Sequence, residues 1–415
     1  MSRVAWVVAL LAVPGMASAD TLVQGAISAA TGYTDNALTA PSNSALTSPK
    51  SDFFTDLGPS LSLIADQPRL VATFTALGSL RQYFNETQAN NRSVKLLGLL
   101  NWEIEKQWRL AWDLTGTFGE QGSFEPTGIV GAIPQGGGTY IQLATGGTLY
   151  RDFSPSWRGA ESVRLTLFDP LEDTLAQPRT VSIEDDVSAQ LSFARDAAAL
   201  TLGVVVSHFT ATTVNPLPTT QNEIVNLQAS WLHELSLFWG ILGAAGGGFV
   251  LADGQVTAAP TGRVALTFHR ELTDFEVALA EVLATDSLVG LTNVRTDATV
   301  RLAMQVTDTI TLRVLAGAAH DEAVASDIAI DSIRFETGAN WKLRENFELD
   351  LSQAFIYQRS EETTGLVPDL HRNTITLALR AYLPDHRPPS FAYGQQNLRV
   401  RQSEEWDQTE AQRQK

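Results

Sequence analysis

The sequence predicts an all-β fold, a transmembrane antiparallel up-and-down β-barrel of about eighteen strands. Three observations predict it. Apolar and polar residues alternate along most of the chain, the N-terminus resembles an export signal, and the segments between the alternating stretches are by turns short and long. A barrel that spans a bilayer has these features because its wall faces hydrocarbon outside and water inside, and because short turns join its strands at one end and longer loops at the other.

The alternation is clearest between Gln107 and Phe118. Every second residue from Trp108 to Phe118 is apolar or glycine, and the residues between them include Arg109, Asp113 and two threonines. Successive side chains of a strand point to opposite faces, so this segment has one apolar face and one polar face. Because the pattern recurs to the end of the chain, it indicates a wall between lipid and water.

The N-terminus predicts export. Residues 1–19 combine the positive charge of Arg3, the apolar run Val4 to Val13 and the small-residue cleavage pattern Ala17-Ser18-Ala19. A buried helix is the alternative, but the run is too short to span a bilayer and a Pro-Gly pair breaks it. We therefore expect a signal peptide over 1–19, a barrel over 20–383, and a polar, disordered periplasmic tail over 384–415.

Eighteen segments show strand periodicity between clusters of Gly, Pro, Asn and Asp. In order they are Thr21–Tyr33, Phe53–Ile64, Arg69–Gln82, Arg92–Trp102, Gln107–Phe118, Thr139–Tyr150, Arg158–Phe168, Thr180–Phe193, Ala198–Thr210, Glu223–His233, Leu237–Val250, Thr261–Arg270, Asp274–Ala284, Asn293–Met304, Thr309–Ala318, Ile328–Trp341, Asn346–Tyr357 and Arg372–Leu383. Most reach the ~9–11 residues that a tilted membrane strand needs.

The connections alternate in length. Short ones are Ala65–Pro68, Glu103–Lys106, Ala194–Ala197, Glu271–Thr273, Gln305–Asp308 and Lys342–Glu345, and long ones are Thr34–Asp52, Gly119–Gly138, Asp169–Arg179, Ala211–Asn222, His320–Asp327 and Gln358–His371. The loop Gly119–Gly138 is either an inward-folded constriction or a plain surface loop. A soluble propeller or solenoid is the alternative architecture, but no fixed repeat period supports it.

Three places fit the pattern poorly. Leu237 to Phe249 shows no clean alternation, so its facing is undecided. Glu281 falls on the lipid face of a regular strand, which a bulge or a position near the rim would resolve. Pro59 lies inside a strand, where proline is tolerated near an end or at a bulge. Aromatic residues, by contrast, gather near the short turns as an interfacial girdle would: Trp102, Trp108, Trp157, Trp231, Trp239, Trp341 and Phe347.

Charged residues of both signs lie on the polar face of the predicted strands. Because charges cannot face hydrocarbon cheaply, we expect them to line the lumen. The candidates are Arg109, Asp113, Arg164, Arg263, Arg301, Arg313, Arg334, Glu336, Glu348, Asp350 and Arg380. For any one of them, pairing across strands that only braces the wall is an equal alternative to contact with a solute. About eighteen strands is a size that leaves an aqueous channel unless something plugs it.

Composition excludes several kinds of chemistry. The chain has no cysteine, which excludes thiolate metal sites and cysteine catalysis, and its net charge of −17 argues against binding nucleic acid. The six histidines are scattered, and no nucleophile elbow, P-loop or dinucleotide fingerprint occurs. The run Glu184-Asp185-Asp186 reads as a solvated rim rather than a divalent-ion site. We expect no enzyme activity, catalytic residue, metal or cofactor.

The opening of the chain resembles a known family. The segments TGYTDNAL (Thr31–Leu38) and SDFFTDLGPSLSLIADQPRLVATFTALGSLRQYFN (Ser51–Asn85) are similar to outer-membrane β-barrels of the myxobacterial type that are associated with exopolysaccharide export. The resemblance covers the first third of the chain and implies polysaccharide cargo and a periplasmic polysaccharide export protein as partner. It assigns no binding residue, and the tail after Tyr382-Leu383 departs from barrels that end on an aromatic residue.

These observations predict a protein of the Gram-negative outer membrane, surrounded by outer-membrane lipid. The leading hypothesis is a channel that exports a secreted polysaccharide, held weakly and repeatedly by the polar lumen. A general or small-solute porin is the first alternative. A non-conducting surface barrel, serving as an enzyme or adhesin, is the second.

Overall fold

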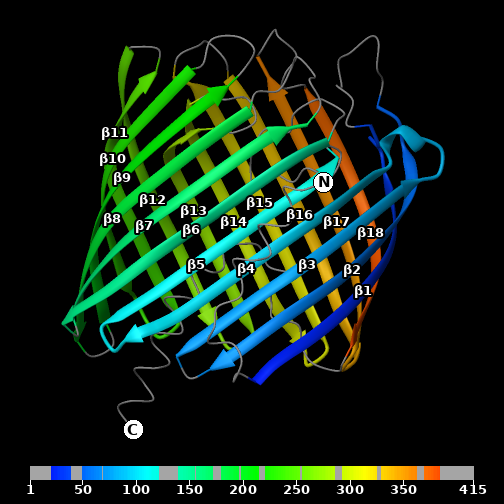
Figure 1. Cartoon of the computed structure of the whole chain (residues 1–415), viewed down its shortest axis with the longest axis horizontal. Helices are drawn as coiled ribbons and strands as arrows, with labels where there is room; N and C mark the ends of the chain where they lie inside the picture. The colour runs from blue at the N-terminus through cyan, green and yellow to red at the C-terminus, as the bar shows by residue number, and fades with distance from the viewer. Residues whose placement is uncertain are drawn as a thin grey trace, which may run out of the picture.

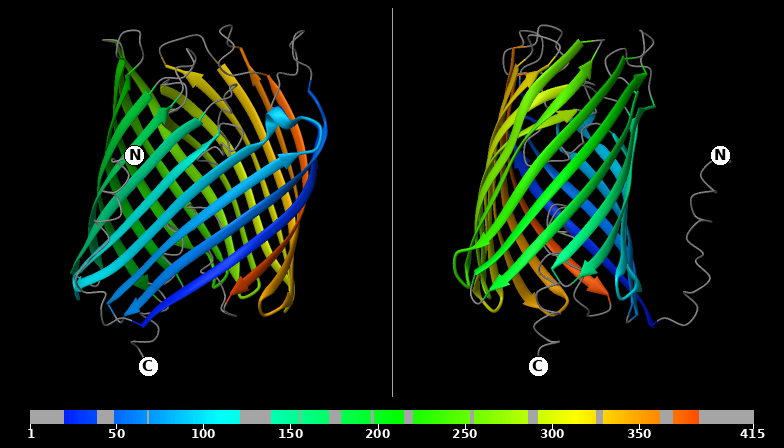
Figure 2. Two further views of the ribbon diagram at one scale, coloured as in Figure 1. Left: turned by 45° about the vertical axis from the view of Figure 1, so that its right-hand side comes forward. Right: turned by 90° about the vertical axis from the view of Figure 1, so that its left-hand side faces the viewer.

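The chain forms one closed β-barrel in the computed structural model (Figures 1 and 2). The structure describes residues 20–38, 49–67, 69–120, 139–154, 156–171, 179–195, 198–214, 220–252, 255–285, 292–324, 329–361 and 369–383, so the predicted signal peptide, tail and most of the loop Gly119–Gly138 lie outside the described residues. Eighteen antiparallel strands pair in chain order, and β1 pairs with both β2 and β18. The predicted fold class is confirmed.

The strands are longer than those of most soluble sheets, at 13 to 17 residues each. Their bounds are β1 Asp20–Thr34, β2 Asp52–Gln67, β3 Leu70–Tyr83, β4 Asn91–Glu105, β5 Trp108–Glu120, β6 Thr139–Ser154, β7 Trp157–Pro170, β8 Arg179–Arg195, β9 Ala198–Val214, β10 Thr220–Glu234, β11 Trp239–Ala252, β12 Gln255–Arg270, β13 Thr273–Thr285, β14 Thr292–Thr307, β15 Ile310–Ala323, β16 Ala329–Arg344, β17 Phe347–Ser360 and β18 Leu370–Leu383. A single 3₁₀ turn, η3 (Thr87–Ala89), follows β3 within the described part of the chain. No helix among the described residues is long and apolar enough to cross a membrane.

The wall has an apolar outer face. Large apolar side chains at every second position of most strands are about half exposed, for example Leu61 at 50%, Val163 at 49% and Leu279 at 60%. We call this outward-facing set the apolar belt. The alternate positions face the inside of a closed barrel because successive side chains of a strand point to opposite faces. An apolar exterior around a closed barrel is the architecture of an outer-membrane protein, since closure joins the first strand to the last and leaves the sheet no terminal edge in hydrocarbon.

At the short-turn end of the barrel, the same irregularity in strand pairing recurs in several hairpins. A shift in pairing register occurs one residue before the turn in four hairpins, at Glu103/Glu105, Asp152/Ser154, Gln305/Thr307 and Lys342/Arg344. In three of these hairpins the next strand begins with an aromatic residue: Trp108, Trp157 or Phe347. Arg151 lies 4.8 Å from the ring centroids of both Trp108 and Phe153. Aromatic residues thus gather at this end of the barrel, as an interfacial girdle would.

Pro59 interrupts the pairing of β2 with β3 without a bulge. The pairs Leu57–Leu80 and Ser60–Leu77 share one register, and the two positions between them do not pair. Pairing with β1 continues through Ile27 and Pro59, so the missing N–H lies on the β3 side. The expectation that Pro59 needs a strand end or a bulge was wrong, because one lost ladder step is tolerated while both neighbours remain in place.

The wall departs from regular pairing more strongly between β12 and β13. Their ladder ends at Gly262–Glu281, although β12 continues along β11 up to Gln255 and β13 continues along β14 up to Thr285. We call this junction, formed by Gln255–Thr261 of β12 and Val282–Thr285 of β13, the β12–β13 seam. The strand predicted from the sequence began at Thr261 and lacked the first six of the sixteen residues of β12.

Register places Glu281 on the outer face with no bulge at that position. It lies in one outward-facing row with Thr296, His320, Asp331 and Arg359, which are successive cross-strand neighbours from β13 to β17. The row below it holds Leu279, Ala298, Ala318, Ile333 and Tyr357. The polar row therefore marks the upper limit of the apolar belt on this side, and Glu281 belongs to that limit.

The segment Leu237 to Phe249, whose facing the sequence left undecided, alternates between the outer and inner face like the other strands. Its pairing with β10 shows this. Trp231 of β10 pairs with Gly243 of β11 and covers it, because a Cβ on this glycine would lie 2.3 Å from the indole ring. Outward positions are thus odd-numbered, with Phe249 59% exposed. The glycines hide the pattern because they carry no side chain to read.

Candidate functional site: the charged inner face

The inner face of the barrel carries charged residues of both signs. Strand register places all eleven predicted lumen residues on this face, opposite the apolar belt: Arg109, Asp113, Arg164, Arg263, Arg301, Arg313, Arg334, Glu336, Glu348, Asp350 and Arg380. Whether they contact a moving solute remains a prediction. The structure does show which of them lie together.

Asp113 and Arg164 form a pair that spans a strand. They lie on β5 and β7, and the Arg164 Nη2 donates to both carboxylate oxygens of Asp113 at 2.9 and 3.0 Å. Gly146 of β6 lies between them, and a Cβ there would be 3.2 Å from Asp113 Oδ1. The missing side chain gives the pair room to bridge β6, so a bulkier residue at this position would push it apart.

The same arrangement recurs on the other side of the barrel. Arg313 of β15 donates to Asp350 of β17 across Gly338 of β16, where a Cβ would lie 3.2 Å from the guanidinium. Tyr382 donates its hydroxyl to Glu348 at 2.9 Å. In both arrangements an arginine and a carboxylate two strands apart meet above a glycine.

Further inner-face pairs lie on neighbouring strands. Arg263 donates to Glu276 at 3.0 Å, and Arg334 donates to Glu336 through its Nε at 2.7 Å. Arg380 donates to the Tyr382 hydroxyl at 3.4 Å and lies 3.9 Å from Glu348. Arg109 lies 3.9 Å from Asp152. Each predicted residue in this set thus has an inner-face neighbour of opposite charge.

Several members of this network were not among the residues predicted from the sequence. Arg158 donates to Asp152 at 2.8 Å, and Arg295 donates to Asp321 at 2.5 Å. Asp321 is 2% exposed. Asp152 and Asp321 lie near strand ends that the sequence placed in connections, so their alternation was not counted, whereas Arg158 and Arg295 fall inside predicted strands but were not among the candidates. Cross-strand register alone could have identified them.

The acidic run Glu184-Asp185-Asp186 is divided between the two faces. Glu184 and Asp186 pair with the inner-face residues Arg164 and Ser162, while Asp185 pairs with Val163 on the outer side. Among the described residues, no group of three or more His, Asp or Glu side chains is arranged to hold a metal ion.

The pairs remain open to solvent. The side chains of Arg164 and Asp113 are 34% and 28% exposed, and that of Arg263 is 46% exposed. A charged group that keeps part of its surface exposed inside a barrel must be hydrated there. The inner face therefore offers both donors and acceptors to water or to any polar molecule that replaces it.

Comparison with known proteins assigns no family to the chain. No family model and no curated protein matches the chain. Similar solved structures include OccK2 (OpdF) of Pseudomonas aeruginosa, with 9% identity, a TM-score of 0.45 and coverage of 88% of this chain and 98% of that one. OpdK of Pseudomonas aeruginosa has 11% identity, a TM-score of 0.44 and coverage of 87% and 99%. A BenF-like porin from Pseudomonas fluorescens Pf-5 has 10% identity, a TM-score of 0.46 and coverage of 88% and 99%.

Proposed function

We propose that the protein is an outer-membrane channel for small polar solutes. The observation that carries this proposal is the inner face itself, on which partly exposed ion pairs of both signs line the wall from β5–β7 to β15–β17. Charges that stay partly exposed inside a barrel must be hydrated, which favours a water-filled interior. Eighteen strands is a size at which barrels enclose an aqueous channel.

The charge pattern suggests a solute that makes many weak contacts. Arg164, Arg263 and Arg313 of the inner face each already have a carboxylate neighbour, so an ionic solute finds no strong single site at these positions. Neutral polar groups such as hydroxyls exchange one donor or acceptor for another along the wall at little cost. Conduction requires binding that is weak and repeated, and this pattern meets that requirement.

Planar-bilayer recording of the refolded protein tests the proposal. We expect open channels with weak ion selectivity, because the charges of both signs are balanced. Asp350→Asn should shift the reversal potential toward anions, since it leaves the charge of Arg313 uncompensated, and Arg313→Gln should shift it toward cations. Glu161→Gln is the matched control, because Glu161 lies on the outer face beside Val163 and should leave selectivity unchanged. A refolded barrel that shows no conductance would overturn the proposal that the protein is a channel.

Export of a polysaccharide is the more specific prediction. It is supported only by the resemblance of the first third of the chain to barrels associated with exopolysaccharide export. The same weak, repeated contacts suit a sugar polymer. Gene deletion separates the two cargoes: retained polysaccharide with unchanged small-solute uptake favours the polymer. Liposome swelling with pentoses and hexoses that requires the protein, together with normal polysaccharide secretion in the deletion strain, favours the small solute.

A further inference from the structure

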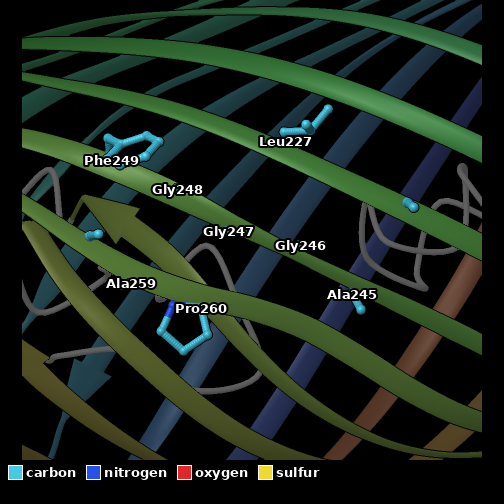
Figure 3. A pocket seen from close by; sticks show the side chains of 10 residues that line it. Leu227, Ala245, Gly246, Gly247, Gly248, Phe249, Ala259 and Pro260 are labelled. Atoms are coloured by element: carbon cyan, nitrogen blue, oxygen red, sulfur yellow. The ribbon is translucent and has the colours of Figure 1, made fainter.

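The outer surface of β10–β12 is hollowed. A groove of about 570 Å³ runs over Gly246-Gly247-Gly248 of β11 and is lined by Leu227, Phe249 and Pro260 among others. Figure 3 shows Leu227 and Phe249 on one side of the glycine run and Ala259 and Pro260 on the other. The volume is within the ~300–1,000 Å³ typical of small-molecule sites. The groove opens among exposed apolar side chains on the outer face of β10–β12.

The wall beside this groove is the β12–β13 seam. Leu283 belongs to the outward-facing positions of β13, yet it packs against Ile224 and Val250, which are inner-face residues of β10 and β11. A Cβ on Gly248 would lie 2.4 Å from Leu283 Cδ1. The upper end of β13 therefore lies inside the sheet of β10–β12 rather than beside it. The two edges overlap, and Leu283 fills the space between them.

The edge of β12 at the seam offers hydrogen-bond acceptors. Ala258 to Thr261 do not pair with β13, although all belong to a strand, and Pro260 has no N–H to donate. Glu281, at the last pair of the ladder, adds a carboxylate on the outer face. An apolar groove beside an acceptor-rich edge suits a molecule with one hydrocarbon chain and a head group that donates a hydrogen bond.

We propose that the groove and the seam form a lateral entrance from the outer part of the bilayer for a single-chain amphiphile with a hydroxyl head group. The chain lies over the glycine run, and the head group donates to the free edge of β12. Leu283 closes the inner side of the entrance, and its displacement connects the groove to the interior of the barrel. The entrance is independent of polar conduction along the bore, and either property can fail without the other.

Photolabelling in vesicles tests this entrance. The probe is a hexadecanol that carries a diazirine near the end of its chain, in phosphatidylcholine vesicles that contain the refolded protein. We expect insertion into the groove, into Leu283 of the seam, and into the inner-face residues Ile224 and Val250 against which Leu283 packs. The methyl ether of the same alcohol, which cannot donate, should label the seam much less. Leu283→Ala should raise labelling of the inner face.

Gly247→Leu is the decisive variant. A Cβ on Gly247 meets only Ala259 O at 3.6 Å, an ordinary contact, so the backbone accepts a side chain here, and a leucine would extend over the groove. Filling an apolar site should reduce labelling of groove and seam by about tenfold or more. Gly147→Leu is the control, because Gly147 is also an outer-face glycine, with Trp112 Cδ1 at 3.7 Å. A heat-dependent gel shift checks that each variant is folded, and Ala245→Leu, which also fills the groove, replaces Gly247→Leu if that variant does not fold.

Three outcomes would overturn the proposal. Labelling spread evenly around the apolar belt would show only ordinary lipid contact. Labelling confined to outward-facing residues would remove the passage to the interior. Equal labelling of wild type and Gly247→Leu would exclude the groove as the route. Because the probe reports on the seam, these results leave the conductance experiments on the bore unaffected.

Discussion

Two prolines interrupt the wall of this barrel, with different consequences. At Pro59 the pairing of β2 with β3 stops and then resumes in the same register. At Pro260 the pairing of β12 with β13 has stopped at Gly262 and does not resume, although both strands continue. One missing N–H is thus not enough to open the wall. The difference lies in the neighbouring strand. β3 remains beside β2 in the sheet, whereas the upper end of β13 lies inside the barrel, where Leu283 packs over the inner face of β11 at Gly248, which has no side chain.

Cysteine cross-linking gives the largest expected contrast between the two sites, and the chain has no native cysteine to interfere. Ser60→Cys with Leu77→Cys places two thiols at a paired position, where Cα atoms are about 4.5–5.5 Å apart and a disulfide fits. Thr261→Cys with Val282→Cys would face each other only if the β12–β13 ladder continued. We expect near-complete disulfide formation in the first pair and very little in the second, measured by gel mobility after mild oxidation.

Fast oxidation of the second pair would mean that the seam closes, and would remove the structural basis of the lateral entrance. The first pair is the internal control for folding and for thiol access, since both pairs lie on the inner face.

Charge on the outer face gives the next largest contrast. Leu61→Arg places a cation in the middle of the apolar belt beside Pro59 and should lower the free energy of unfolding by about 2–4 kcal/mol. Glu281→Arg places the same charge in the polar row beside the seam, where the expected cost is only about 0–1 kcal/mol. Guanidinium unfolding in vesicles, followed by tryptophan fluorescence, measures both.

Equal costs for the two variants would show that the row of Glu281, His320 and Asp331 lies as deep in the bilayer as Leu61. The upper limit of the apolar belt would then be wrong. Leu61→Met controls for the loss of shape without charge.

How far the sequence predicts this wall depends on the side chains that carry the signal. From Trp108 to Phe118, and again in β18, alternation alone assigned each residue to the correct face. It failed where glycine replaces side chains, at Gly246 to Gly248, because nothing there reports the facing of the strand. The glycine-bridged pairs, such as Asp113 with Arg164, could not be predicted, since they depend on the register of strands two apart.

Asp52 lies where β2 begins and β3 ends, at the long-loop end of the barrel. Its carboxylate accepts hydrogen bonds from the backbone N–H groups of Phe53, Asn85 and Glu86 at 2.7–2.8 Å and from the Asn85 side chain at 2.9 Å. Burial of Asp52 works to raise its pKa, but these bonds together outweigh burial and lower the pKa below the usual aspartate value. A lowered pKa in the folded state means that the stabilisation is present above the unfolded pKa and is lost as pH falls through the folded pKa.

We therefore expect the loop at Asn85 and Glu86 to be protected from amide exchange near pH 7 and to lose that protection in the acid range below about pH 4. Asp52→Ala should remove it at every pH, at a local cost of about 1–3 kcal/mol. Protection of these amides in Asp52→Ala that equals the protection in the wild type near pH 7 would contradict the role of the carboxylate. Asp56→Ala is the control, because Asp56 pairs with Arg81 lower on the same strand.

The smallest expected effect compares the prolines directly. Pro59→Ala restores an N–H that points toward β3, where Gly78 stands opposite, so the new amide should pair and add about 0.5–1.5 kcal/mol to the free energy of unfolding. Pro260→Ala restores an N–H on the side of β13, where the ladder has already ended, so no comparable gain is expected. Hydrogen exchange should show a protected amide at position 59 and a fast one at position 260. Protection at both would mean that proline chemistry, rather than the displacement of β13, keeps the seam open.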